Sequence, residues 1–230
     1  AVSLAGISVS ASIVDNLIAN TVMAYIEANN SAHTLAASGA VAIKANQSQA
    51  RIEESNAVTA SVAAGLFAVS GGGVDIDHKI DNTISASISG PTNSPTDIMV
   101  SGGDISIEAL ENAYLSADAV NVTVAFGLGA AIGVSLLDVE ISSDIQAQVD
   151  ETNIDGTRLL VHADSVANIG ENATAGISAS LVGAVGNHAK SYLKTKVTAS
   201  IDRSTVTITG DVDVKATAQN TARASAQGGA

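Results

Sequence analysis

The sequence predicts an all-β solenoid in which about four similar units stack on one another. Two short apolar phrases recur in the same order four times along the 230 residues. Other stretches alternate apolar and small residues at period two, which is the period of a β-strand. Aromatic residues make up only 2% of the chain and Trp is absent, so the core must be built from small and β-branched side chains. Stacked repeats produce thin cores of this kind.

The first phrase is a five-residue stretch with a central Ala between two large apolar residues. Its copies start at Val22, Ile84, Ile145 and Val197, and their central residues are Ala24, Ala86, Ala147 and Ala199. The second phrase places two apolar residues and an Ala at alternate positions. Its copies start at Val41, Ile105, Leu159 and Val212. Each copy of either phrase is predicted to be a short strand with one buried face.

The spacing of the phrases defines the repeat. The first phrase recurs at steps of 62, 61 and 52 residues, and the second at steps of 64, 54 and 53. A basic unit near 52 residues, with insertions in the earlier copies, accounts for both series. It gives units of approximately 1–45, 46–109, 110–163 and 164–230 within a single repetitive segment, which we expect to belong to a longer array. The polar, turn-rich spans 27–39 and 89–103 are predicted to be variable surface loops.

The longest alternating stretch is Val120–Leu136 in the third unit. Apolar residues occupy nine alternate positions there, all of them large except Ala130, and Asn, Thr, Ala, Gly and Ser lie between them. This pattern predicts a strand and opposes a helix. One interpretation is a strand buried on both faces, whose small-residue face lets another sheet or coil approach closely. The other is a membrane-inserting strand, since about 9–11 alternating residues cross a bilayer; the missing aromatic girdles argue against it.

The charge of the chain restricts its partners. The formal net charge is −13 and the sequence pI is about 4.4. Nucleic acids and anionic membrane surfaces need basic patches, so neither is an expected partner. An acidic chain suits a soluble extracellular protein. Cys is absent, which excludes disulfides and thiolate metal sites.

The sequence offers no catalytic constellation. No nucleophile elbow, P-loop or dinucleotide fingerprint is present, so we expect a non-enzymatic protein. The four histidines lie at non-equivalent places without metal-ligand spacing: His33, His78, His162 and His188. His162 occupies the polar slot that Lys44, Glu108 and Lys215 fill in the other units, which predicts a solvated position. His78 is also expected on the exposed face of a strand.

Calcium is the one cofactor that the sequence indicates. Asp150, Asn153 and Asp155 bring oxygen-bearing side chains together before the turn residue Gly156, and hard cations accept such loops. The spacing is not that of an EF-hand, because a Glu at the twelfth position is missing. The alternative interpretation is ordinary turn chemistry on a solvated surface.

The last unit shows the repeat pattern most fully. Ala199-x-Ile201-x-x-Ser204-x-Val206 is followed by Gly210-x-Val212-x-Val214-x-Ala216. This pattern resembles the repeats of giant secreted bacterial surface proteins, the filamentous haemagglutinin-like and leukotoxin-like adhesins. The resemblance implies an elongated, right-handed parallel β-helix that is exported to the cell surface for adhesion or self-association. The long Gly-rich strands depart from the short strands of those repeats, so some long or antiparallel strands are expected.

Together these observations predict a structural and adhesive module of a large exported bacterial surface or filament-forming protein. The expected partners are neighbouring repeats or identical subunits, together with a receptor on a host or neighbouring cell; a membrane is not an expected partner. The alternative is a pore-forming, leukotoxin-like segment that inserts its alternating Gly-rich strands into membranes.

Overall fold

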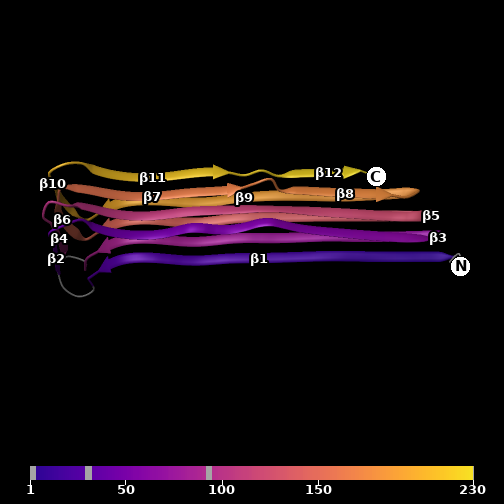
Figure 1. Cartoon of the computed structure of the whole chain (residues 1–230), viewed down its shortest axis with the longest axis horizontal. Helices are drawn as coiled ribbons and strands as arrows, with labels where there is room; N and C mark the ends of the chain where they lie inside the picture. The colour runs from indigo at the N-terminus through magenta and orange to yellow at the C-terminus, as the bar shows by residue number, and fades with distance from the viewer. Residues whose placement is uncertain (1–3, 29–32, 92–94, 230) are drawn as a thin grey trace.

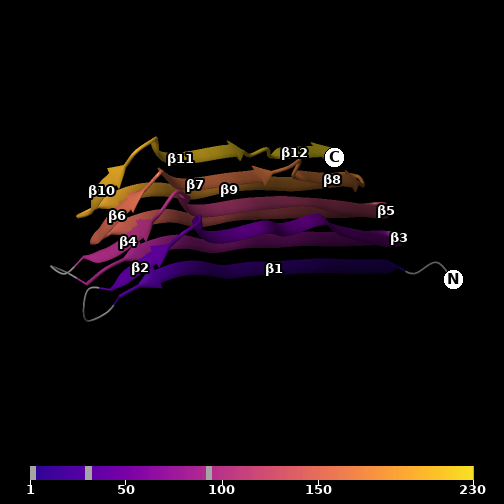
Figure 2. The same ribbon diagram turned by 60° about the vertical axis from the view of Figure 1, so that its left-hand side comes forward.

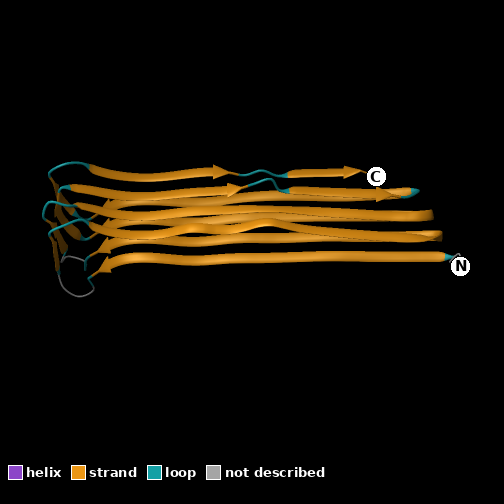
Figure 3. Cartoon of the chain, in the orientation of Figure 1, coloured by secondary structure: helices purple, strands orange, loops and turns teal. Residues whose placement is uncertain are grey.

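The chain folds into a flattened parallel β-solenoid, described here by a computed structural model for residues 4–28, 33–91 and 95–229 (Figures 1 and 3). The described residues contain strands and no helix. Each coil has a long outgoing arm, a tight distal turn, a long returning arm and a short strand at the proximal end, where β2, β4, β6 and β10 lie. The predicted all-β solenoid is confirmed.

The strands differ widely in length. Their bounds are β1 Ala5–Glu27, β2 Thr34–Ala37, β3 Val41–Ser89, β4 Thr96–Val100, β5 Asp104–Asp150, β6 Thr152–Gly156, β7 Arg158–Ile169, β8 Ala173–Ala179, β9 Val182–Asp202, β10 Thr205–Ile208, β11 Val212–Thr221 and β12 Ser225–Gly229. β3 and β5 each run out and fold back, so each supplies both arms of one coil. Gly127, with φ of +117°, lies at the distal turn of β5.

Every strand pairs with its neighbours in parallel. The outgoing layer contains residues 41–65 of β3, residues 104–126 of β5, then β7 with β8 and β11 with β12. The returning layer contains β1, residues 67–89 of β3, residues 128–150 of β5, and β9. The short strands form a separate sheet in the order β10-β6-β4-β2. Figure 2 shows the two layers facing each other and the short strands at the proximal end. The long strands are therefore parallel, not antiparallel.

The pairing register confirms the alignment of the phrases. The first phrase stacks in the returning layer as Val22, Ile84, Ile145 and Val197. The second stacks in the outgoing layer as Val41, Ile105, Leu159 and Val212. Because like residues stack, each coil continues the same buried face.

Irregularities in pairing occur in the outgoing arms and at the distal turn. The returning arms pair over their full lengths without a register shift. β3 contains three shifts relative to β5: two in its outgoing arm, between Gln47 and Ala50 and between Ile52 and Ser55, and one at the distal turn, between Ala64 and Phe67. In the fourth coil the outgoing arm is interrupted between β7 and β8. There the Asn172 side-chain oxygen accepts a hydrogen bond from the Ala117 backbone N–H at 2.8 Å, replacing a strand partner.

The interior between the layers changes character along the arms. A proximal cluster of Ile, Val, Leu and Ala includes Ile84, Ile105 and Ile145, and a middle cluster includes Ile76, Leu115 and Ile141. The distal cluster consists of four alanines: Ala63, Ala68, Ala125 and Ala131. Large buried apolar side chains thus end at Val74 and Leu137, and the buried apolar side chains nearer the distal turn are alanines.

The spans predicted to be loops contain strands. Within 27–39 lies β2, and within 89–103 lies β4. Leu35, Ile98 and Val100 pack into the proximal cluster, which explains why these spans are ordered into a sheet. The prediction of purely loop structure is wrong there, while residues 29–32 and 92–94 lie outside the described part of the chain.

Candidate functional site

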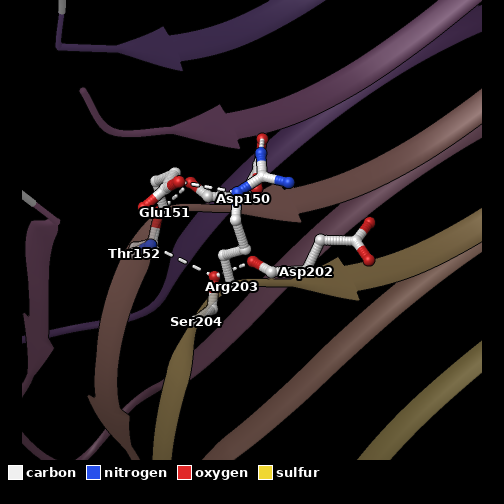
Figure 4. Close-up of polar contacts among 6 residues, drawn as sticks. All are labelled: Asp150, Glu151, Thr152, Asp202, Arg203 and Ser204. Atoms are coloured by element: carbon white, nitrogen blue, oxygen red, sulfur yellow. Dashed lines mark hydrogen bonds and ion pairs between the residues drawn. The ribbon is translucent and has the colours of Figure 1, made fainter. Parts of the chain in front are cut away.

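The residues expected to bind calcium lie on two elements at the proximal end. Asp150 ends β5, and its Oδ2 accepts a hydrogen bond from Nη2 of Arg203 at 2.5 Å (Figure 4). Asn153 lies on β6, and its amide donates to Oδ1 of Asp97 at 2.9 Å. Asp155, also on β6, is exposed. Within 4–28, 33–91 and 95–229, no group of three or more His, Asp or Glu side chains is placed to hold a metal ion. Calcium binding stays a prediction.

The corner around Arg203 connects two consecutive coils. Glu151 and Arg203 hold equivalent places where a returning arm bends into a short strand, and their φ angles are 50° and 43°. The Arg203 Nε donates to Oε1 of Glu151 at 2.6 Å, and the Thr152 N–H donates to Oγ of Ser204 at 3.1 Å (Figure 4). Arg203 is largely exposed, so these ion pairs orient the corner more than they stabilise it. The geometry indicates a structural role.

His162 lies where the sequence predicts. The register places it in an outward row with Lys44, Glu108 and Lys215, in successive coils of the outgoing layer. Lys44 Nζ lies 2.9 Å from Oε2 of Glu108, so the row is a chain of surface charges. His162 is partly exposed in this row, and its Nε2 lies 3.0 Å from Oδ2 of Asp213.

The prediction for His78 is wrong, because its side chain is fully buried. Its Nε2 lies 2.6 Å from Oγ of Ser55, and its Nδ1 lies 2.8 Å from the backbone oxygen of Asp77. Burial lowers the pKa of His78, while the Asp77 backbone hydrogen bond and the charges of Asp77 and Asp15 oppose that shift. Alignment of the repeats could have predicted this burial, because His78 is in register with Val139, an interior residue of the next coil.

Glu111 is a buried carboxylate that the sequence analysis missed. Its side chain separates the proximal and middle apolar clusters and is 4% exposed. Its Oε1 accepts hydrogen bonds from Nδ2 of Asn82 at 2.8 Å and Oγ of Ser143 at 2.5 Å. Its Oε2 accepts from Oγ of Ser165 at 2.7 Å. The partners come from three coils, so this group links the layers and the coils at once. The sequence did indicate this burial, because Glu111 falls on the same alternate positions as the buried apolar residues on either side of it.

In the distal half of the solenoid, large apolar side chains point outward and small or polar side chains point inward, which is the reverse of an ordinary protein. The large residues of Val120–Leu136 point outward: Phe126 is 61% exposed, Leu128 57% and Ile132 54%. The small and polar residues between them point inward, among them Asn121, Thr123 and Ser135. The prediction that both faces of this strand are buried is therefore wrong.

Close approach of the two layers explains the small inward side. A Cβ on Gly72 would lie 2.8 Å from Oδ1 of Asn121, and one on Gly133 would lie 3.2 Å from that atom. The Ser70 hydroxyl donates to the backbone oxygen of Ser61 on the opposite arm at 2.8 Å. The prediction that the small face admits a closely packed sheet is thus confirmed.

Charge is absent from this half of the described coils. Residues 4–14, 55–74, 119–137 and 172–187 contain no Asp, Glu, Lys, Arg or His. On the returning layer the uncharged region ends at Asp15, Asp75, Asp138 and His188, and Asp15, Asp77, Asp138 and Lys190 form an outward row in register there. On the outgoing layer it ends at Asp118. We call the region beyond these residues the distal half.

Comparison of the chain with protein-family models, with curated proteins and with solved structures found no match. In the described part of the chain, no helix has the length and apolar character needed to cross a membrane. The resemblance to haemagglutinin-like and leukotoxin-like repeats stays a prediction.

Proposed function

We propose that the chain is a non-enzymatic structural module of a large exported bacterial surface or filament-forming protein, which stacks end to end with further repeats or copies. The observation that carries this proposal is the matching pair of open faces on the first and last coils. One face presents the edges of β1, β2 and residues 41–65 of β3, and the other presents the edges of β9, β10, β11 and β12.

The two open faces are complementary in strand direction and length. β1 has 23 residues and β9 has 21, and both are returning arms. β2 and β10 have 4 residues each. A second copy placed head to tail would continue all three sets of strands in parallel. Such heterologous contacts generate open filaments when they do not close into a ring.

Side chains at the open faces also support stacking. Ala24 and Ile26 in the first coil and Ala199 and Ile201 in the last are only partly buried, although their counterparts in the middle coils are fully buried. A further coil would cover these residues and pair the free backbone groups. Solenoids gain stability from such nearest-neighbour interfaces.

The experiment compares the wild-type chain with Val214→Lys, whose side chain faces inward at the open C-terminal face. Inward-pointing charge on an edge strand opposes further pairing. The matched control is Val166→Lys, on the outward face of β7. We expect concentration-dependent rods in negative-stain images of the wild type and the control, and only short particles with Val214→Lys. Monomers of all three at high concentration would refute stacking by this chain.

Adhesion to a receptor and a location outside the cell belong to the same proposal. The outward faces of the proximal half carry the surface charges that a receptor would meet, such as the row from Lys44 to Lys215. Binding of the labelled chain to bacterial or host cells, reduced by charge reversal along that row, would support adhesion. Equal binding of the wild type and a charge-reversed variant would contradict it.

The pore-forming alternative predicts leakage. The interior of the distal half is filled by contacts such as the Asn121 amide donating to the backbone oxygen of Val134 at 3.3 Å. This packing favours the structural proposal over a conducting coil. Release of dye from liposomes by the isolated chain would favour the alternative.

A further inference from the structure

We propose that the distal half enters the hydrocarbon layer of a lipid bilayer, while the row containing Asp15, Asp77 and Asp138 stays at the head groups. The starting observation is that the large apolar side chains of the distal half face outward and the small or polar ones face inward. Large exposed apolar patches on soluble proteins mark interaction sites, and here the exposed apolar residues occur on both layers and beside the distal turn. Examples are Val62 on the outgoing layer, Val69 on the returning layer and Phe67 at the turn.

The length of the uncharged region fits a bilayer. The distal turn is separated from the first charged residue by eight residues on each arm at the shortest, as between Asp118 and Phe126 or between Phe67 and Asp75. Other spans are longer, such as the ten residues between Leu128 and Asp138. At ~3.3 Å per residue these spans measure about 26–33 Å. The hydrocarbon core of a bilayer is about 30 Å thick.

The interior of the distal half meets the second requirement of a lipid environment in part: the hydroxyls of Ser61 and Ser178 are paired, while Oγ1 of Thr59 and Oγ1 of Thr174 have no hydrogen-bond partner. Polar groups inside hydrocarbon must find partners within the protein. The Ser178 hydroxyl donates to the backbone oxygen of Ala131 at 2.7 Å, and the Ser61 hydroxyl donates to Oγ of Ser8 at 2.8 Å. Membrane-spanning strands alternate apolar residues outward and polar residues inward, which is the alternation found here.

A bilayer fits this surface better than a second copy. A protein partner docks on one face, whereas the apolar residues cover both layers, so one copy would leave the other layer exposed. Face-to-face approach of two returning layers in register would also oppose their acidic rows, at a net charge of −13 per chain. Hydrocarbon surrounds both layers at once.

The charge distribution selects the lipid class. The acidic row and the overall negative charge disfavour anionic head groups, so the partner is a zwitterionic bilayer. In the sequence, the net charge of −13 and the missing aromatic girdles oppose a membrane partner. The structure removes the first objection for the distal half, because the charges lie outside it.

Insertion rests partly on the proposed stacking. The first and last coils expose strand edges in the distal half, and unpaired backbone groups are costly in hydrocarbon. Neighbouring coils or copies would pair these groups. Self-association and membrane binding are therefore measured separately.

The experiment is flotation of the full chain with vesicles of phosphatidylcholine. The test variant combines Val62→Lys and Ile132→Lys, which lie on opposite layers, each four residues from Leu66 or Leu128 beside the turn. This depth is near the middle of the proposed span. The control combines Leu17→Lys and Val166→Lys, an equal charge change at exposed aliphatic residues of the proximal half.

We expect the wild type and the control to float with the vesicles. One lysine at mid-bilayer depth weakens partition by about 30-fold or more, so the test variant should stay at the bottom. Circular dichroism checks that all three are folded, which exposed substitutions should allow. Failure of the wild type to float, or equal loss in the test and control variants, would overturn the proposal. So would binding that requires anionic lipid.

Sedimentation without vesicles separates this proposal from stacking. If the wild type forms oligomers but does not float, and the test variant is a monomer, then the apolar surface joins copies of the chain. That result would overturn insertion. Flotation of a chain that sediments as a monomer would support insertion while contradicting stacking. Flotation of an oligomer that Val214→Lys disrupts would support both.

Discussion

Removing the buried carboxylate of Glu111 should destabilise the solenoid strongly. Glu111→Ala leaves three buried donors without their acceptor: the Asn82 amide and the hydroxyls of Ser143 and Ser165. An unpaired buried polar group costs about 1–3 kcal/mol. The hydroxyls can rotate toward other acceptors, so each falls at the low end, whereas the amide is fixed. The expected loss in free energy of unfolding is about 3–5 kcal/mol.

Glu111→Gln separates hydrogen bonding from charge. The glutamine oxygen can still accept from Asn82 and Ser143, and its NH₂ can donate to the Ser165 hydroxyl. Weaker neutral hydrogen bonds are offset by the smaller desolvation cost of an uncharged group. We expect Glu111→Gln to lose less than half of what Glu111→Ala loses.

Urea unfolding followed by circular dichroism measures these differences. Glu108→Ala is the matched control, since Glu108 lies three residues earlier and forms a partly exposed pair with Lys44. Such a pair contributes about 1 kcal/mol or less. A loss below about 1 kcal/mol for Glu111→Ala, or equal losses for its Ala and Gln variants, would refute the reasoning.

Two further perturbations follow from the same interior. Gly127→Ala should cost at least about 2 kcal/mol in chemical unfolding, because its φ is +117° and a Cβ would overlap the Gly65 carbonyl; Gly186→Ala, in open space, should change stability by less than about 1 kcal/mol, and equal losses would contradict this explanation. Since burial lowers the pKa of His78, the unfolded chain binds the proton more readily, and stability should fall as the pH drops below about 6.5, by at most about 1.4 kcal/mol per pH unit. Urea midpoints between pH 5 and 7.5 measure this change. If the stability of a His78→Gln variant depends on pH as steeply as that of the wild type, His78 is excluded as the cause.

The sequence was sufficient for the repeat and its register. Stacking of Ala24, Ala86, Ala147 and Ala199 follows from pattern alone, because a one-residue slip would turn every buried side chain outward. Parallel pairing could not be derived in the same way, since alternation at period two is common to both strand directions. The distal turn, at which each coil reverses direction, was indicated in the sequence only weakly, by Gly65 and Gly127.

The inverted distal half could not be predicted because of an assumption about which face is buried. In Val120–Leu136 the large residues were assigned to the interior, as hydrophobic burial suggests. The closely spaced layers instead admit only small side chains, and that spacing is a property of the facing arm. His78 and Glu111 were missed for the related reason that their side-chain partners lie on other arms or coils, distant in the sequence.

The contrast between the two layers bears on how such an array could change over evolution. A single inserted residue in a returning arm would reverse the facing of every residue beyond it, so insertions and deletions there should be selected against. The outgoing arm of β3 carries two extra residues relative to β5, and each lies at a register shift where the residues on either side keep the same facing. The outgoing layer can therefore accept changes in length one residue at a time. The returning layer keeps a constant length and so maintains the pairing register that all coils share.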